Sequence, residues 1–234
     1  VTTATLAPDA PHPDRCGSCE ACLPSCPTDA LAQPRFVDAR RCLAFHTIEH
    51  QQTLPPDVAV VQLRERDLSG KALFELACAV RDVCHRPEHR AALVINDRVD
   101  VALASGADGV HLRQSSVSVT DARALLGPDR LIGASCHSRE ELERARGADY
   151  ATLGPVFATP SKRDLGQPLE LAGLKRALEG PREGLPRVVG LGGITLATAR
   201  PVLECGADGL AAIRAFWERD PASQAARLWA ILRA

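Results

Sequence analysis

Apolar, β-branched runs alternate with segments of helical periodicity over most of this chain. The first clear run is VAVVQL at 58–63, and six more follow, at 91–96, 109–113, 131–135, 150–153, 187–191 and 209–213. Helix-forming segments follow these runs, at 71–84, 97–107, 120–126, 138–146, 169–178, 195–205 and 222–232. Continuous apolar runs are typical of strands buried on both faces, and their alternation with helices predicts parallel βαβ units.

Seven strands are one fewer than a closed (β/α)8 barrel of the TIM type requires. The only further candidate is CLAFHTIE at 42–49, and the link from there to residue 58 is too short for a normal helix. We therefore expect an α/β fold over residues 51–234, a (β/α)8 TIM-type barrel whose first β/α unit is atypical or missing.

Composition excludes several classes of protein. Aromatic residues make up only 3% of the 234 residues, so a core must be built from Ala, Val, Leu and Ile. A net charge of −1 gives no broad attraction to nucleic acid or membrane surfaces. No apolar run approaches the roughly 20 residues of a membrane span, and the N-terminus has no signal-peptide pattern. We expect a cytoplasmic protein, whose nine cysteines are thiols or metal ligands.

A cysteine cluster precedes the expected barrel, after a stretch at 1–14 that we expect to be disordered. Cys16, Cys19, Cys22 and Cys26 stand at C-x2-C-x2-C-x3-C, followed by Pro27. This spacing is typical of bacterial ferredoxins, in which such thiolates hold a [4Fe–4S] cluster. The alternative is a loop of free cysteines.

Residues 15–50 resemble the iron–sulfur region of epoxyqueuosine reductases, in CGSCEACLPSCPTDA and in DARRC followed by TIE. The resemblance implies one cluster on Cys16, Cys19 and Cys22, and a second on Cys26 with Cys42. The remaining cysteines of that family have no counterpart here. We therefore expect a partial, ferredoxin-like segment that binds at most one [4Fe–4S] cluster.

Polar side chains follow the expected strands where a barrel of this type has its active site. They are Gln62, Arg64 and Arg66; Asn96 and Asp97; His111 and Gln114; Ser135 and His137; Thr159, Ser161 and Lys162; and Gly192 with Gly193. The loop GPVFATPSK supplies two hydroxyls and a cation, which suits a phosphate. Glycine amides in GLGGI and the loop AAIR, with Arg214, match the usual phosphate site of such barrels.

About residues 57–219 resemble the thiamine-phosphate synthase / thiazole tautomerase (TenI) family. The matching motifs are VQLRERDLSG, INDRVDVALASGADGVHL, IGASCHSREEL, ADYATLGPVFATPSK, VVGLGGI and GADGLAAI. The resemblance implies that Gln62, Arg64, Asn96, Ser135 and Lys162 face a pyrimidine diphosphate, that Thr159, Ser161 and Gly193 hold a thiazole phosphate, and that Asp97 binds Mg²⁺.

The chain departs from the synthase pattern at four positions. The synthase motif HLGQxD is HLRQSS here, with Arg113 for Gly and Ser116 for the Asp that is a second Mg²⁺ ligand. Losing a carboxylate weakens a metal site, while Arg113 brings a charge of its own. Arg66 replaces a lysine, which keeps the charge but changes its geometry. Arg214 replaces a serine that helps bind thiazole phosphate, and an arginine can still bind a phosphate there.

These departures favour the tautomerase branch, with His137 as proton shuttle and Arg64 and Lys162 as the other catalytic residues. One alternative is a Mg²⁺-dependent thiamine-phosphate synthase, in which His137 only makes local hydrogen bonds at a helix start. Another is an inactive, truncated fusion with a vestigial iron–sulfur segment. We expect His111 to be structural. The expected partners are small phosphorylated substrates, and the sequence is compatible with a homo-oligomer.

Overall fold

The computed structural model describes the backbone at residues 31–33, 36–37, 59–65, 67–87, 91–159, 167–212 and 221–233. The chain divides into two compact units, Val1–His46 and Thr47–Ala234. In the first unit, β1 (Leu31–Gln33) pairs with β2 (Phe36–Val37) in antiparallel fashion. The cysteines of the predicted cluster and the candidate strand at 42–49 lie outside the described residues, so the cluster and the domain boundaries stay predictions.

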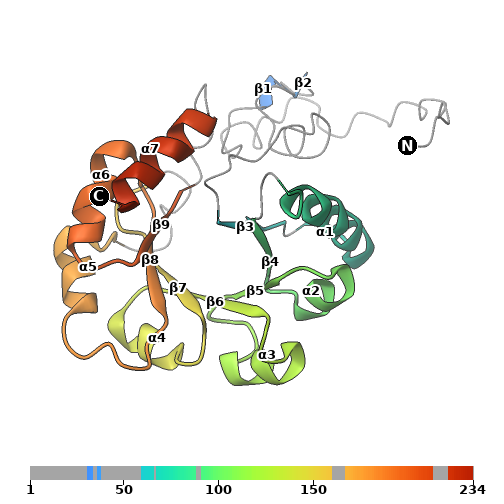
Figure 1. Ribbon diagram of the computed structural model, residues 1–234, viewed down its shortest axis with the longest axis horizontal. Helices are drawn as coiled ribbons and strands as arrows, with labels where there is room; N and C mark the ends of the chain where they lie inside the picture. Colours follow the sequence, from blue (N-terminus) through green and yellow to red (C-terminus); the bar gives the residue numbers. More distant parts are fainter. Residues whose placement is uncertain are drawn as a thin grey trace. The chain divides into compact units, whose positions relative to one another are not determined.

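Seven parallel strands, hydrogen-bonded in chain order, form the sheet of the second unit. They are β3 (Val60–Leu63), β4 (Ala92–Asn96), β5 (Gly109–Leu112), β6 (Leu131–Cys136), β7 (Tyr150–Leu153), β8 (Arg187–Leu191) and β9 (Gly209–Ala211). The sheet curls, and the helices lie along its convex side (Figure 1). The predicted α/β barrel-type fold is confirmed. Within the described residues the curl is open between β9 and β3, as the missing first unit predicts.

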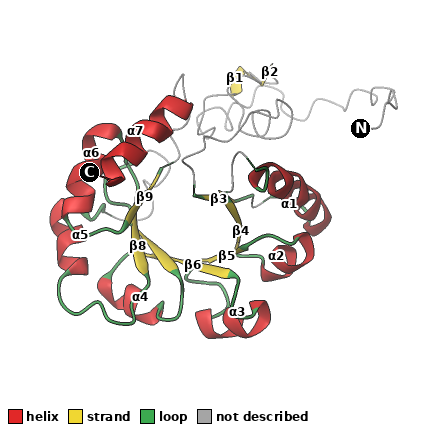
Figure 2. Ribbon diagram, viewed as in Figure 1, coloured by secondary structure: helices red, strands yellow, loops and turns green. Residues whose placement is uncertain are grey.

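Helices connect the strands and cover the sheet (Figure 2). They are α1 (Gly70–Cys84), α2 (Val99–Ser105), α3 (Val119–Leu126), α4 (Arg139–Arg144), α5 (Glu170–Leu178), α6 (Leu196–Glu204) and α7 (Pro221–Arg233). Ser69, Ser118, Ser138 and Thr195 are side-chain N-caps of α1, α3, α4 and α6. These caps satisfy helix N–H groups that have no partner within the helix.

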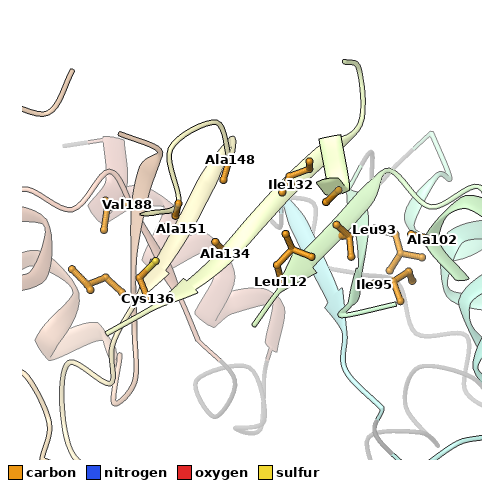
Figure 3. Packing of buried hydrophobic residues seen from close by; sticks show 14 of the residues in the cluster. Leu93, Ile95, Ala102, Leu112, Ile132, Ala134, Cys136, Ala148, Ala151 and Val188 are labelled. Carbon is orange, nitrogen blue, oxygen red and sulfur yellow. The ribbon is translucent and has the colours of Figure 1, made fainter. Parts of the chain in front are cut away.

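The core between sheet and helices is built from small and branched aliphatic side chains, as the composition requires. Ile132 and Val188 are fully buried, and Figure 3 shows them with Leu93, Ala134 and their neighbours along adjacent strands. Burying such side chains contributes about 25 cal/mol per Å² of apolar surface, so this layer provides the main stabilisation. The parallel register of the strands places their carboxyl ends at one edge of the sheet.

A repeated Gly-Ala-Asp sequence anchors the opposite edge of the sheet. Asp108, Asp149 and Asp208 each accept a hydrogen bond of 2.7 Å from the first part of the preceding strand, at the N–H of Leu93, Ile132 and Val188 respectively. Each carboxylate also pairs with a cationic side chain or a histidine, namely His85, Arg123 or Arg182. The aspartates thereby satisfy strand N–H groups where each βαβ unit begins.

Replacing Asp149 by Ala should lower the free energy of unfolding by about 1–3 kcal/mol, because the buried N–H of Ile132 loses its partner. Urea unfolding followed by circular dichroism measures this. The matched control is Glu75→Ala, whose exposed contact with Lys71 is 3.9 Å long and should contribute less than about 0.5 kcal/mol. Equal losses in the two variants would contradict the anchoring role of Asp149.

Candidate active site

The ends of β3 and β4 are joined by a side-chain hydrogen bond. Nε2 of Gln62 donates to Oδ1 of Asn96 over 3.0 Å. Asn96 is only 8% exposed at the last position of β4, whereas Gln62 is exposed. The bond fixes the Asn96 amide and orients Gln62, so two of the predicted substrate-binding residues lie together.

His111 links three strands inside the curled sheet. The ring belongs to β5 and is 1% exposed; Nδ1 lies 3.0 Å from the hydroxyl of Tyr150 on β7, and Nε2 lies 2.9 Å from Oγ of Ser135 on β6. Gly133 makes room for this bridge, because a Cβ there would lie 2.6 Å from Nδ1. The interpretation of His111 as structural agrees with this geometry.

The imidazole of His111 is neutral at ordinary pH. Burial lowers its pKa to about 4, and the positive charge of Arg64 adds to the effect. Burial also raises the pKa of Tyr150 above its usual value. A neutral ring donates from one nitrogen and accepts at the other, so it can bridge the two hydroxyl groups and position Ser135.

Asp97 is engaged by the two residues at which the sequence departs from the synthase pattern. Oδ2 accepts from Nη2 of Arg113, and Oδ1 accepts from Oγ of Ser116. Burial raises the pKa of Asp97, but the hydrogen bonds from Ser116 and Arg113 and the charge of Arg113 outweigh it and leave that pKa below its usual value. Asp97 is therefore an ionised, fully paired carboxylate.

His137 makes local contacts at the start of α4. Its backbone N–H donates to Oε2 of Glu141 over 2.6 Å, and its Nδ1 lies 3.0 Å from the same oxygen. Ser138, the N-cap, accepts from the N–H of Glu141 over 3.3 Å, and the Glu141 carboxylate reaches back to His137. These are the contacts that the structural interpretation of His137 predicts.

The two loops predicted to bind phosphate pack against each other. The N–H of Phe157, after β7, donates to the carbonyl oxygen of Gly192, after β8, over 3.1 Å. Gly193 has φ 67°, and a Cβ there would lie 2.6 Å from Cβ of Phe157. Only glycine combines this left-handed conformation with so close an approach. Helix α6 begins directly after these glycines, with Thr195 as its cap.

Comparison with known proteins identifies the family. The sequence profile of the family described as thiamine monophosphate synthase matches residues 37–216. The chain belongs to the thiamine monophosphate synthase family. A putative thiamine-phosphate synthase of Geobacter sulfurreducens is 45% identical over 181 residues, which cover 75% of this chain and 81% of that protein. The family resemblance inferred from the motifs is thereby confirmed.

Two further relatives differ in extent. The thiamine biosynthesis bifunctional protein ThiM/ThiE of Symbiobacterium thermophilum is 46% identical over 184 residues, and the match spans 74% of this chain but only 37% of that protein. The structure of thiamine phosphate pyrophosphorylase from Pyrococcus furiosus superposes with a TM-score of 0.67 and 32% identity, covering 78% of this chain and 87% of that one. The synthase family fold therefore accounts for the larger unit.

The profile of the thiamine monophosphate synthase family begins earlier than the motifs indicated, at residue 37 rather than about 57. It includes residues 42–49, the candidate first strand. The resemblance of residues 15–50 to epoxyqueuosine reductases and the [4Fe–4S] cluster stay predictions.

Several predicted site residues lie together in the structure, and others lie outside its described part. Gln62 and Asn96 are bonded, Ser135 is held by His111, and Gly192 and Gly193 lie beside the loop that leads to Thr159. Arg64 is exposed at the end of β3. The residues outside the described part are Arg66, Ser161, Lys162 and Arg214, with Cys16, Cys19, Cys22, Cys26 and Cys42. Their roles stay predictions.

The sequence interpretation missed two partners, Tyr150 and Glu141. Tyr150 is the chain's only tyrosine and opens the buried strand YATL, which was a usable signal, since a buried tyrosine hydroxyl needs a hydrogen-bond partner. Glu141 stands three residues after the N-cap Ser138, a spacing typical of a capping box, but its contact with His137 was not predicted.

The residues around Asp97 do not fit the predicted Mg²⁺ site. Mg²⁺ requires oxygen ligands in near-octahedral geometry, and both oxygens of Asp97 already accept hydrogen bonds. Among the described residues no group of three or more His, Cys, Asp or Glu side chains could hold a metal ion.

No helix of the described part is long and apolar enough to cross a membrane.

Stability should fall as the pH falls from about 6.5 to about 4, because unfolded His111 takes up a proton in that range while the buried ring does not. The loss from this group is on the order of 3 kcal/mol. Urea unfolding of the wild type and of His111→Asn at pH 7 and pH 5 isolates the contribution of His111. The free energy of unfolding of the variant should fall less between the two pH values than that of the wild type. A His111 ring whose NMR signals titrate near pH 6.5 in the folded protein would contradict the burial argument.

Proposed function

We propose that this chain is a thiamine-phosphate synthase that joins a pyrimidine diphosphate to a thiazole phosphate. The observation that carries the proposal is that the strand ends present two separate groups of residues, each suited to a phosphorylated group. One is the arginine-rich edge at the ends of β3 to β5, with Arg64 and Arg113. The other is the pair of packed loops after β7 and β8, with Gly192 and Gly193. A joining reaction needs both, whereas isomerisation of one thiazole phosphate needs one.

The names of the relatives support the same choice. The Geobacter sulfurreducens protein is called a putative thiamine-phosphate synthase, and it is similar over three quarters of this chain. The hydrogen bonds between His137 and Glu141 give His137 a local role that does not require it to be a proton shuttle. The synthase interpretation, given above as an alternative, is therefore the better supported one.

In the proposed reaction the C–O bond between the pyrimidine methylene and the diphosphate breaks, and the diphosphate leaves with the bonding electron pair. The ring nitrogen of the thiazole supplies the electron pair of the new C–N bond, so thiamine phosphate and pyrophosphate are formed. Gln62 and Asn96 bind the pyrimidine, and Ser135 donates or accepts a hydrogen bond as the neutral His111 allows. Lys162, Ser161 and Arg214 are predicted to complete the two phosphate sites.

Preorganised donors and cations contribute most where charge develops in the transition state, which is on the departing diphosphate. The polar groups at the strand ends are fixed before substrate binds, because Asn96 is buried and bonded and Ser135 is held by a buried ring. Little reorganisation is then needed during the reaction.

Incubation of the full chain with pyrimidine diphosphate and thiazole phosphate should yield thiamine phosphate and pyrophosphate in equal amounts. Asn96→Ala should lower kcat/KM about tenfold or more, because a buried hydrogen-bonding group beside the substrate is lost. The control is Arg176→Gln, which removes an exposed guanidinium on α5, on the outer layer. If neither product forms under conditions in which the chain is folded, the proposal is wrong and the inactive fusion is favoured.

The thiazole tautomerase is the second candidate, and one observation favours it. Glu141 engages Nδ1 of His137, which leaves Nε2 as the ring atom that could move a proton. His137→Ala separates the two functions. We expect the joining reaction to stay within about twofold of wild type, since a partly exposed residue with local contacts contributes about 0.5 kcal/mol or less. Conversion of a thiazole tautomer by the wild type, abolished in His137→Ala, would instead establish the tautomerase.

A further inference from the structure

Arg113 and Ser116, at which this chain departs from the synthase pattern, contact the same carboxylate. The guanidinium of Arg113 donates a hydrogen bond to Oδ2 of Asp97, and the hydroxyl of Ser116 donates one to Oδ1. In the synthase pattern these positions hold a glycine and a second carboxylate. The two substitutions therefore act together: one removes a metal ligand, and the other supplies a fixed positive charge to the ligand that remains.

Hydrogen bonds of the backbone fix both partners of the ion pair between Arg113 and Asp97. The N–H of Arg113 donates to Oγ of Ser116 over 2.7 Å, and the N–H of Ser116 donates to the carbonyl oxygen of Arg113 over 3.0 Å. On the other side, the N–H of Asp97 donates to the carbonyl oxygen of His111 over 2.9 Å. Asp97 has φ 68°, a conformation that Asp tolerates better than most residues. The sheet thus holds the ion pair in one place.

The charge balance at this ion pair disfavours a divalent cation. Asp97 and Arg113 together carry no net charge, so Mg²⁺ would meet the guanidinium without an unpaired carboxylate to offset the repulsion. Arg98 adds a second positive charge close to Asp97, although its own bidentate partner is Asp100, at 2.8 and 2.6 Å. Asp100 balances Arg98, so the four groups carry no net charge, and an oxyanion would be bound by the directed N–H donors of Arg113.

Arg113 keeps donors for such an anion. Its side chain is 39% exposed, so the guanidinium can be reached from solvent. Asp97 accepts a hydrogen bond from Nη2. Nε is buried and has no hydrogen-bond partner in the part of the chain that the structure describes, so an anion would be bound by the remaining N–H groups at the exposed end of the guanidinium. A guanidinium has five N–H donors in a planar fork that matches two phosphate oxygens.

We propose that Arg113, held by Asp97 and Ser116, is the cation that binds the diphosphate of the pyrimidine substrate, and that it does so without Mg²⁺. The identity of the substrate rests on the proposed function. Arg64, at the end of β3, lies close enough to His111 for its positive charge to lower the pKa of that histidine. Arg64 therefore adds positive potential at the same strand ends. The departing diphosphate would then be neutralised by arginine side chains of the chain itself.

Calorimetric titration of the full chain with inorganic pyrophosphate, once in EDTA and once with Mg²⁺, tests this directly. The wild type should bind in EDTA, and added Mg²⁺ should change the affinity by less than about threefold. Arg113→Gly should weaken binding in EDTA about tenfold or more, because a charge-assisted contact is lost. The affinity of Arg113→Lys should lie between those of the wild type and Arg113→Gly, since lysine keeps the positive charge but loses the planar, two-donor geometry of the guanidinium. Arg176→Gln is the matched control and should bind as the wild type does.

The converse variant, Arg113→Gly combined with Ser116→Asp, should bind pyrophosphate only when Mg²⁺ is present. The inference is overturned if the wild type itself requires Mg²⁺, if Arg113→Gly binds as tightly as wild type in EDTA, or if the double variant still binds without metal. Circular dichroism verifies folding, and Arg113→Lys with Arg113→Gln replaces the glycine variant if that one does not fold.

Binding of pyrophosphate does not depend on turnover, so the two proposals can fail separately. A chain that binds pyrophosphate through Arg113 in EDTA but forms no thiamine phosphate refutes the proposed function and leaves the anion site. A chain that forms thiamine phosphate only with Mg²⁺ refutes the anion site and leaves the proposed function.

Discussion

Parallel pairing of the strands is the constraint on which the site depends, because it fixes both edges of the sheet at once. Asn96 is paired in register with His111, and Ser135 with Thr152. A polar side chain at the end of one strand therefore lies beside a polar side chain of the next. The aspartates of the repeated Gly-Ala-Asp sequence secure the opposite edge, where each carboxylate accepts from a strand N–H. Stabilising contacts and candidate site residues thus occupy different edges, which is typical of barrel enzymes.

The state of charge at the site follows from burial. His111 is kept neutral inside the curled sheet, so it can position Ser135 without adding a charge of its own. Asp97 is kept ionised by Ser116 and Arg113, against the opposing effect of burial. The net result at the ends of β3 to β5 is a set of neutral hydrogen-bonding groups beside arginines, one of which, Arg113, is paired with Asp97. Such an environment suits a neutral heterocycle that carries a diphosphate.

The elements of the larger unit could be predicted from sequence because each is specified locally. Continuous apolar runs such as LIGAS and helix starts such as Ser138 carry their own signals, and the strand order follows from the short connections. The contact of Asp97 with Ser116 could not be predicted in this way. This contact joins residues that are 19 positions apart in the sequence. Asp97 also has a positive φ, and no local sequence pattern predicts that conformation. The sequence identified the substitution at Ser116 as a lost ligand but not as a new hydrogen bond.

The same limit applies to His137, which the sequence favoured as the proton shuttle and whose role stays a prediction. A histidine after a strand suits proton transfer by its side-chain type alone, and His137 was assigned that role. Its actual partner, Glu141, lies one helical turn onward, where a carboxylate also satisfies the free N–H groups of a helix start. At a helix start the carboxylate has this structural use whether or not the histidine reacts. The arginine at 113 is the more informative departure, because its partner comes from another strand end and nothing in the local chain requires a cation there.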